Sequence, residues 1–298
     1  MDFGQIITAM VTPFNEQGGF DACATQSLIR HLIENGSDSI VVGGTTGESP
    51  TLSFEEKKQL FAVAVHEANG EIPVIAGTGS NNTWQTIELS LAAEAAGVDA
   101  LMIVVPYYNK PSQEGIYQHV KAVANATHLP IMLYNVPGRT GVSMSPETTL
   151  RLATLPNVVA TKEASGNLDA VTEIIRLAPE DFAVYSGDDS LTLPMLSLGA
   201  KGVVSVASHI VGREMKELTN AFFTGHVQAA SAIHQRLFPL MRGMFMAPNP
   251  TPVKAALDAF GVPCGSVRLP LLPLTNEEAG ALDQLIAPFR PYAALPYE

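Results

Sequence analysis

Short apolar runs rich in valine, isoleucine and threonine recur along the chain, with longer amphipathic segments between them. Runs of this kind are typical of parallel strands that are buried on both faces. After the first run, Leu28, Ile29, Leu32 and Ile33 follow helical spacing as far as Gly36. We expect eight strands, at Gln5–Phe14, Asp38–Thr46, Pro73–Gly79, Ala100–Tyr108, Pro130–Pro137, Val158–Ser165, Phe182–Ser190 and Gly202–His209.

Capping signals mark several of the helices between these strands. Ser53 and Glu56 have the spacing of a capping box, and Ser145 followed by Pro146 supplies a cap and a first-turn proline. Eight repeats of strand and helix predict an α/β protein, a (β/α)8 TIM barrel. An open, doubly wound sheet is the alternative. It would normally carry a dinucleotide-binding fingerprint after the first strand, and Met10–Gly19 contains none.

The pattern changes after Phe222, where strands stop and only helices follow. Helical spacing is found at Val227–Phe245, Thr251–Phe260 and Asn276–Phe289, with Thr251-Pro252 and Thr275…Glu278 as start signals. Proline-rich joints such as Pro248-Asn249-Pro250 are typical of turns rather than flexible linkers. The sequence therefore predicts a (β/α)8 barrel catalytic domain at residues 1–224 and a C-terminal helical domain at residues 225–298.

Composition excludes several classes of protein. The chain has 298 residues and a net charge of −12, and its 17 basic residues are scattered, which argues against a nucleic-acid or anionic-membrane partner. The N-terminus, MDFGQIITAMVTPF, lacks a basic region before an apolar run, so we expect a strand there rather than a signal. Cys23 and Cys264 are far apart and lack metal-ligand spacing, which favours reduced thiols in a cytoplasmic protein without a metal site.

Lys162 is the first candidate for chemistry, because it ends the apolar run VVATKEASG at residues 158–166. An amine at the rim of a buried parallel sheet is partly desolvated, which lowers its pKa and favours attack on a carbonyl to form a Schiff base. The alternative is a lysine whose stem lies along apolar surface while its head reaches solvent.

Other strand ends carry groups that suit the same chemistry. Glycines and two threonines at residues 43–48 can form a turn whose donors bind a carboxylate or phosphate, although glycine-rich turns are common. Tyr107, Tyr108 and Tyr134 offer hydroxyls that can pass protons, or rings that only pack. Arg139 follows a strand directly and suits a bidentate grip on a carboxylate, or else a surface ion pair. We expect all these groups at one rim of the barrel, where parallel strands end. Together they indicate lysine-dependent carbonyl chemistry on carboxylate substrates. The seven histidines are dispersed and are interpreted as structural.

At these residues the sequence resembles the dihydrodipicolinate synthase (4-hydroxy-tetrahydrodipicolinate synthase) family of the pyruvate-dependent class I aldolase superfamily. The resemblance covers nearly the whole chain and lies in GGTTGES at 43–49, IAGTGSN at 75–81, PYYNKPSQEG at 106–115, LYNVPGRTG at 133–141 and TKEASGNL at 161–168. It implies a lyase of lysine biosynthesis that condenses pyruvate with aspartate semialdehyde and needs no cofactor. It also implies a homo-oligomer, a tetramer built as a dimer of dimers.

The resemblance further implies a role for each site residue. Lys162 would form the imine with pyruvate, while Tyr134, Thr45 and Tyr108 of a neighbouring subunit would relay protons. The pyruvate carboxylate would be held by Thr45, Thr46 and the backbone at Val204, and the semialdehyde carboxylate by Arg139. Ser165 and His209 depart from the residues frequent in the family. A related aldolase or sugar-acid lyase similar to N-acetylneuraminate lyase remains the nearest alternative, and a non-catalytic pyruvate or amino-acid binding protein the more distant one.

Regulation is the last expectation that the resemblance supports. Members inhibited by L-lysine bind it at positions matching Ser49, Pro50, Phe54, Lys57, Asn81, Gln85 and Tyr107. In sensitive members a carboxylate often stands at the position of Gln85, and Lys57 adds a positive charge near a cationic ligand. Attraction is lost and repulsion gained, so we expect weak or absent inhibition. The alternative is a vestigial site, in which Lys57 pairs with the carboxylate of a lysine bound in another pose.

Overall fold

Eight parallel strands form a closed barrel in the computed structural model, which describes residues 2–290. Neighbouring strands pair in chain order, and β8 pairs with β1 to close the sheet. The (β/α)8 TIM barrel is therefore confirmed. The strands are β1 (Ile6–Ala9), β2 (Ser39–Val42), β3 (Val74–Gly77), β4 (Ala100–Val104), β5 (Ile131–Asn135), β6 (Val158–Glu163), β7 (Ala183–Ser186) and β8 (Gly202–Ser205).

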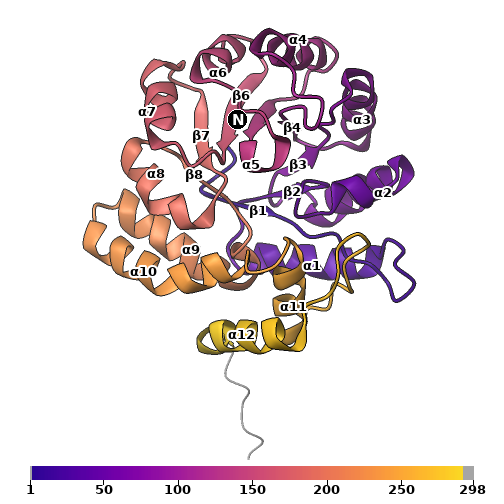
Figure 1. Ribbon diagram of the computed structural model, residues 1–298, viewed down its shortest axis with the longest axis vertical. Helices are drawn as coiled ribbons and strands as arrows, with labels where there is room; N and C mark the ends of the chain where they lie inside the picture. Colours follow the sequence, from indigo (N-terminus) through magenta and orange to yellow (C-terminus); the bar gives the residue numbers. More distant parts are fainter. Residues whose placement is uncertain (1, 291–298) are drawn as a thin grey trace, which may run out of the picture.

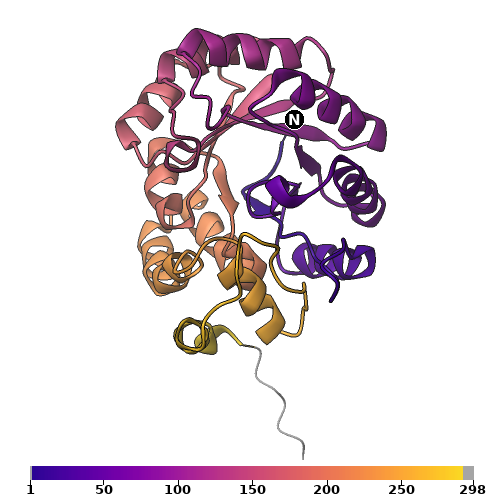
Figure 2. The ribbon, with the colours of Figure 1, turned by 45° about the vertical axis from the view of Figure 1, so that its right-hand side comes forward.

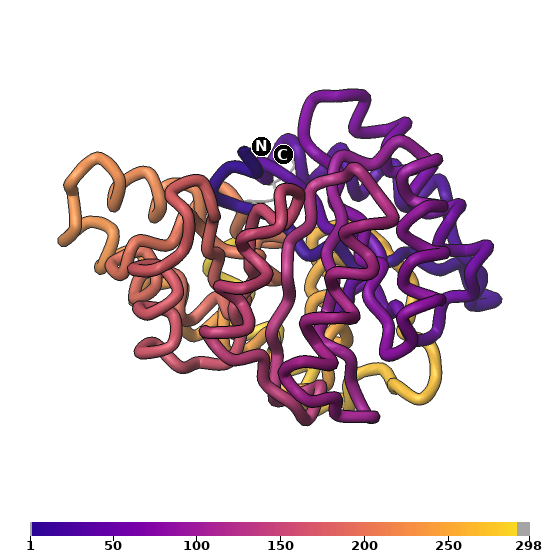
Figure 3. The backbone as a smooth tube through the Cα atoms, turned by 90° about the horizontal axis from the view of Figure 1, so that it is seen from above, coloured from indigo at the N-terminus to yellow at the C-terminus, as the bar shows by residue number. Residues whose placement is uncertain are grey.

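Helices form a ring around the strands, one unit following the next (Figure 1). The ring contains α1 (Ala22–Glu34), α2 (Phe54–Ala68), α3 (Thr83–Ala96), α4 (Gln113–Ala124), α6 (Pro146–Ala153), α7 (Leu168–Leu177), α8 (Thr192–Leu198) and α9 (Ser208–Phe223). Short elements interrupt the loops, namely η1 (Ser49–Thr51), α5 (Pro137–Thr140) and η2 (Asp189–Leu191). Seen at right angles, the chain runs back and forth between the two ends of the barrel (Figure 3).

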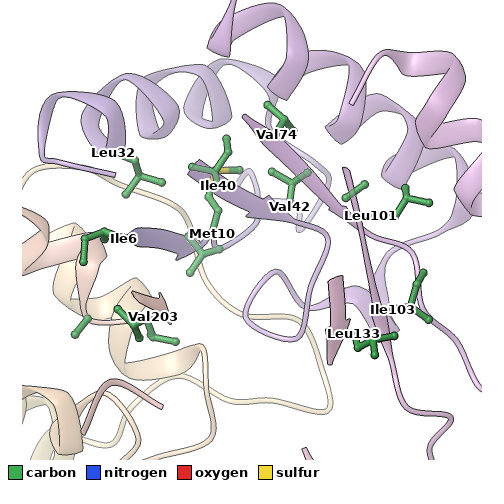
Figure 4. Packing of buried hydrophobic residues seen from close by; sticks show 14 of the residues in the cluster. Ile6, Met10, Leu32, Ile40, Val42, Val74, Leu101, Ile103, Leu133 and Val203 are labelled. Carbon is green, nitrogen blue, oxygen red and sulfur yellow. The ribbon is translucent and has the colours of Figure 1, made fainter. Parts of the chain in front are cut away.

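Side chains alternate between two cores along every strand. Ile6, Ile40 and Leu133 point outward and pack under the helices, as the sticks in Figure 4 show. Their neighbours Ile7 and Val41 belong to a second cluster that fills the inside of the barrel. Because both faces are buried, the strands are mostly apolar, which is why their apolar runs can be recognised in the sequence.

Helix starts follow the capping chemistry expected from the sequence. Ser53 with Glu56 and Thr275 with Glu278 form complete capping boxes, and Ser145 accepts a hydrogen bond from the Thr148 amide. The strands are shorter than predicted at their carboxyl ends. In particular, His209 lies in the first turn of α9, because the chain turns into this helix directly after β8. The Thr251 hydroxyl bonds the Leu272 carbonyl instead of capping its helix.

The C-terminal helices lie outside the ring, beside α9 and α1 (Figures 1 and 2). They are α10 (Val227–Gly243), α11 (Thr251–Ala259) and α12 (Asn276–Ile286), followed by η3 (Ala287–Phe289). We call residues 225–290 the appendage. The proposed domain boundary at residue 224 falls in the turn between α9 and α10; residues 291–298 of the predicted helical domain lie outside the described residues. Among residues 2–290, no helix combines the length and apolarity needed to cross a membrane.

Candidate active site

Lys162 and Tyr134 face each other at the carboxyl end of the barrel. They are register partners on β6 and β5, and both point to the inner face of the sheet. The Lys162 Nζ lies 4.2 Å from the centroid of the Tyr134 ring, and only 5% of Lys162 is exposed. Gly187 follows β7 beside the lysine stem, where an added Cβ would lie 3.1 Å from the Lys162 Cγ. The barrel therefore holds this amine away from bulk water, next to a phenol ring.

The turn at residues 43–49 lies at the same end of the barrel, after β2. Within it the Glu48 amide donates to the Thr45 carbonyl at 3.1 Å, and the Ser49 amide donates to the Gly44 carbonyl at 3.2 Å. Thr46 is buried and accepts a hydrogen bond from Asn249 Nδ2 at 2.9 Å, whereas Thr45 is half-buried. The turn is closed on itself and offers the Thr45 and Thr46 hydroxyls as donors to an oxyanion.

Val204 lies on the inner face of β8, opposite Ile7 of β1. The chain beyond it is held by Asp189, whose Oδ2 accepts from the Val206 amide at 3.0 Å and from the Ala207 amide at 2.9 Å. Burial raises the pKa of Asp189, while these hydrogen bonds favour its carboxylate form. The backbone directly after β8 is therefore held in place by Asp189.

Arg139 belongs to α5, the single helical turn directly after β5, and its side chain is exposed. Its guanidinium makes no hydrogen bond or ion pair within residues 2–290, so it is available to a ligand. The loop that carries it is anchored through Asn135, which accepts from the Met144 amide at 2.9 Å. The Asn135 amide group also donates to the buried Glu163 carboxylate at 3.0 Å. Arg139 is thus a free side chain on an anchored loop.

Tyr108 lies at the surface of the single chain. It is 88% exposed and has a positive φ of 71°, and its amide donates to the Thr140 carbonyl at 3.3 Å. Its hydroxyl makes no hydrogen bond within the described part of the chain. Two more aromatic side chains are exposed: Trp84 at 80% and Tyr107 at 36%.

The residues matched to a lysine site come from three consecutive loops and helix starts. Ser49 begins η1 and Lys57 lies half-buried on α2, where burial lowers the pKa of its amine. The Asn81 carbonyl accepts from Asn109 Nδ2 at 2.9 Å, which links two of these loops. Gln85, on α3, is exposed and accepts from the Ser80 hydroxyl at 3.3 Å.

Four residues of this region were not given a role by the sequence reasoning. Asn249 contacts Thr46 from the joint before α11, and Lys254 of α11 lies 2.8 Å from the Glu48 carboxylate. Asp189 and Gly187 belong to the loop after β7. Strand-end position is the signal that could have found the last two. No local pattern indicates Asn249 or Lys254, because their partners are about two hundred residues away in the sequence.

Both cysteines are free thiols. Burial raises the pKa of the Cys264 thiol to about 12, so this side chain stays protonated, and Cys23 is exposed on α1. Within residues 2–290 no three side chains among His, Cys, Asp and Glu are grouped so that they could hold a metal ion.

Comparison with known proteins gives one consistent result. The model of the Dihydrodipicolinate synthetase family matches residues 2–288. The chain is 62% identical to 4-hydroxy-tetrahydrodipicolinate synthase 1 of Halalkalibacterium halodurans, with 97% of this chain and 98% of that one covered. The crystal structure of a dihydrodipicolinate synthase from Bacillus anthracis has a TM-score of 0.95 at 54% identity, with both chains fully covered. The enzyme from Cyanidioschyzon merolae, solved with lysine bound, has a TM-score of 0.94 at 49% identity, with 96% and 97% covered.

His209 ties the end of β8 to the end of β1. Its Nδ1 donates to the Val206 carbonyl at 2.8 Å, and its Nε2 accepts from the Val11 amide at 3.2 Å, an arrangement that requires the neutral ring. The His209 carbonyl in turn accepts from His31 Nε2 at 2.9 Å. Burial lowers the pKa of His209 from 6.5 to about 4. This histidine therefore holds two strand ends together only while it is uncharged.

We expect low pH to destabilise the fold, because folding requires His209 to stay neutral. Between pH 6.5 and pH 4 the unfolded chain binds a proton at His209 and the folded chain does not, so stability falls as the pH falls, by up to about 1.4 kcal/mol per pH unit. His209→Gln keeps an acceptor for Val11 and cannot titrate. We expect urea unfolding at a series of pH values to show a shallower acid loss for this variant, with His119 still contributing because burial lowers its pKa to about 4. Equal pH dependence in both proteins would contradict this assignment.

Proposed function

The chain belongs to the dihydrodipicolinate synthetase family, and from this premise we propose how the groups at its barrel rim perform the reaction. Its activity is that of a 4-hydroxy-tetrahydrodipicolinate synthase, a Schiff-base-forming lyase of the diaminopimelate route to lysine. Its substrates are pyruvate and aspartate semialdehyde. The observation that carries the assignment of roles is the buried Lys162 amine beside the Tyr134 ring.

The reaction begins at Lys162. In our proposal its free amine attacks the keto carbon of pyruvate, and loss of water gives an imine. Removal of a proton from the methyl carbon then gives an enamine, which attacks the aldehyde carbon of the semialdehyde and forms a carbon–carbon bond. The substrate's own amino group next attacks the imine carbon, which closes the ring and releases Lys162. Tyr134 and Thr45, with Tyr108, relay the protons.

The two substrate carboxylates are held by different parts of the rim. We assign the pyruvate carboxylate to the Thr45 and Thr46 turn, which follows β2, and to the backbone at Val204 of β8. These two strands are the neighbours of β1 in the barrel. The semialdehyde carboxylate is assigned to Arg139, whose guanidinium has no partner within residues 2–290 and whose fork suits two parallel hydrogen bonds.

Pyruvate should form a reducible adduct with Lys162. Treatment with borohydride in the presence of pyruvate should add the mass of one reduced pyruvate unit to the intact protein, and peptide mapping should place it on Lys162. Lys162→Ala is the control and should gain no mass. Supplying pyruvate with either aspartate semialdehyde or N-acetylmannosamine identifies the second substrate. A wild-type protein that gains no pyruvate-dependent mass would contradict the Schiff-base mechanism.

Arg139→Ala distinguishes the binding of the two substrates when borohydride trapping and steady-state kinetics are both measured. The variant should still trap pyruvate, while loss of a charged hydrogen bond of about 1.5–3 kcal/mol raises the KM for the semialdehyde about ten- to hundredfold. Collapse of adduct formation would instead place Arg139 in the pyruvate pocket.

Tyr108 is proposed to act in the site of a neighbouring subunit, since within one chain it lies at the surface with its hydroxyl unpaired in the described residues. This requires a homo-oligomer, and we propose a tetramer built from two dimers. Mixing inactive Tyr108→Phe with inactive Lys162→Ala should restore activity, because a mixed dimer contains one site with both groups intact. Verified mixed dimers without activity would place Tyr108 in the site of its own chain.

Inhibition by L-lysine is proposed to be weak. The residues at Ser49, Asn81 and Tyr107 could still contact such a ligand, but Gln85 is a neutral amide and Lys57 adds a cation nearby. A charged hydrogen bond lost to the ligand's amine weakens binding about ten- to hundredfold. Titration of L-lysine into an assay of the condensation of pyruvate with aspartate semialdehyde should show little inhibition below millimolar concentrations. Gln85→Glu should strengthen it, and strong cooperative inhibition of the wild type would refute the interpretation of Gln85 and Lys57.

The cytoplasmic location and the division into a barrel of residues 1–224 and a helical domain of residues 225–298 remain predictions from the sequence.

A further inference from the structure

The appendage reaches the turn at residues 43–49 at two separate points. Asn249, just before α11, donates to the Thr46 hydroxyl at 2.9 Å. Lys254, within α11, lies 2.8 Å from the Glu48 carboxylate. These two contacts come from positions five residues apart and hold the turn at residues two apart. The appendage therefore holds the turn from outside the barrel, in addition to the hydrogen bonds within the turn itself.

The Lys254–Glu48 ion pair is fully buried, with 3% and 1% of the two side chains exposed. Glu48 has a positive φ of 54°, and its side chain meets the appendage at Lys254. Both carboxylate oxygens are used, because Oε2 accepts from the Arg268 amide at 2.9 Å. Removing one partner of such a pair leaves a buried charge and is strongly destabilising, whereas removing both together is often tolerated.

Lys254 is itself fixed from two further directions. Its Nζ donates to the Ser266 carbonyl at 2.9 Å and lies 4.1 Å from the centroid of the Phe14 ring. Arg268 lies over the same ring at 4.0 Å and pairs with Glu56 of α2 at 2.5 Å. These contacts fix the position of the Lys254 ammonium, and the ion pair in turn fixes the position of the Glu48 carboxylate.

Asn249 acts on the hydroxyl of Thr46 in a complementary way. A hydroxyl has one proton to donate and can accept two hydrogen bonds. Because Asn249 Nδ2 is the donor in this contact, the Thr46 hydroxyl acts as the acceptor and keeps its own proton for another partner. The contact leaves Thr46 able to donate to a carboxylate placed against the turn.

We propose that Lys254 is a positioning residue for the reaction, which acts through Glu48 to hold the Thr45 and Thr46 turn in the geometry that receives the pyruvate carboxylate. The appendage would thereby form part of the pyruvate site without touching the substrate. The proposal rests on the proposed function, since it assumes that this turn binds pyruvate.

A variant pair tests the proposal by removing both charges together. Glu48→Gln/Lys254→Met keeps the side-chain volumes nearly unchanged and leaves no unpaired buried charge, so we expect a folded protein with a thermal midpoint close to that of the wild type. We expect its KM for pyruvate to rise about tenfold, and borohydride-trapped adduct to form more slowly at low pyruvate. The KM for the semialdehyde should stay within about twofold, because Arg139 is carried by a different loop.

Glu56→Gln is the matched control. It weakens the ion pair with Arg268, another contact between the appendage and the barrel, without altering Glu48 or Lys254. We expect a lower thermal midpoint and a KM for pyruvate within about twofold of the wild type. If the double variant does not fold, Glu48→Asp provides the comparison, because it keeps the buried charges paired in sign and shortens the side chain that reaches Lys254. We expect its KM for pyruvate to rise, and an unchanged KM would refute the positioning role.

The outcomes separate the two proposals. A wild-type protein that traps no pyruvate refutes the proposed function. A wild type that traps pyruvate, together with a folded double variant whose KM for pyruvate is unchanged, refutes only the positioning role of Lys254. An equal rise in this KM in Glu56→Gln also refutes it, because the effect would then come from general loosening of the appendage.

Discussion

The alternation of side chains in a closed parallel barrel is the constraint on which the site depends. Each strand sends every second side chain inward, and inward positions near the carboxyl ends are enclosed by the sheet itself. Lys162 and Tyr134 occupy such positions on paired strands, so their contact follows from register alone. A shift of one residue in β6 would move Lys162 to the outer face and place Glu163 inside the barrel.

Buried carboxylates hold the loops around this enclosed centre. Glu163 bonds Asn135 and the Ser165 amide, Asp189 bonds the amides that follow β8, and Glu48 bonds the appendage. Each hydrogen bond to a charged group contributes about 1.5–3 kcal/mol, and leaving such a group unpaired costs more. The loops that carry Arg139 and Thr46, and the chain that follows Val204, are thus held by hydrogen bonds to buried acidic side chains.

The sequence predicts the features that depend on short-range patterns. It does not predict contacts between residues that are far apart in the chain. Eight apolar runs indicated the barrel, and the strand-end position of Lys162 and Arg139 placed both at one rim because parallel strands all end on the same side. The capping boxes at Ser53 and Thr275 were likewise local. Strand ends were predicted too long, as at His209, because apolar residues continue into loops that are also buried. Asn249 and Lys254 follow no periodicity that relates them to the turn they touch, so only the folded chain reveals them.

The contact between the appendage and the turn also fixes an order of events during synthesis. Asn249 meets Thr46 across 203 positions of sequence, and the Arg268 amide meets Glu48 across 220. A chain that has emerged from the ribosome only as far as β8 already contains every strand, Lys162 and Tyr134, yet its turn after β2 lacks these partners. Loop closure costs nearly the same entropy for these contacts as for the pairing of Ile6 with Val203 that closes the barrel, so the order is set by when each segment is made. A nascent barrel would therefore complete its wall before its rim, and would acquire its final geometry only after α11 and the segment that follows it have been made.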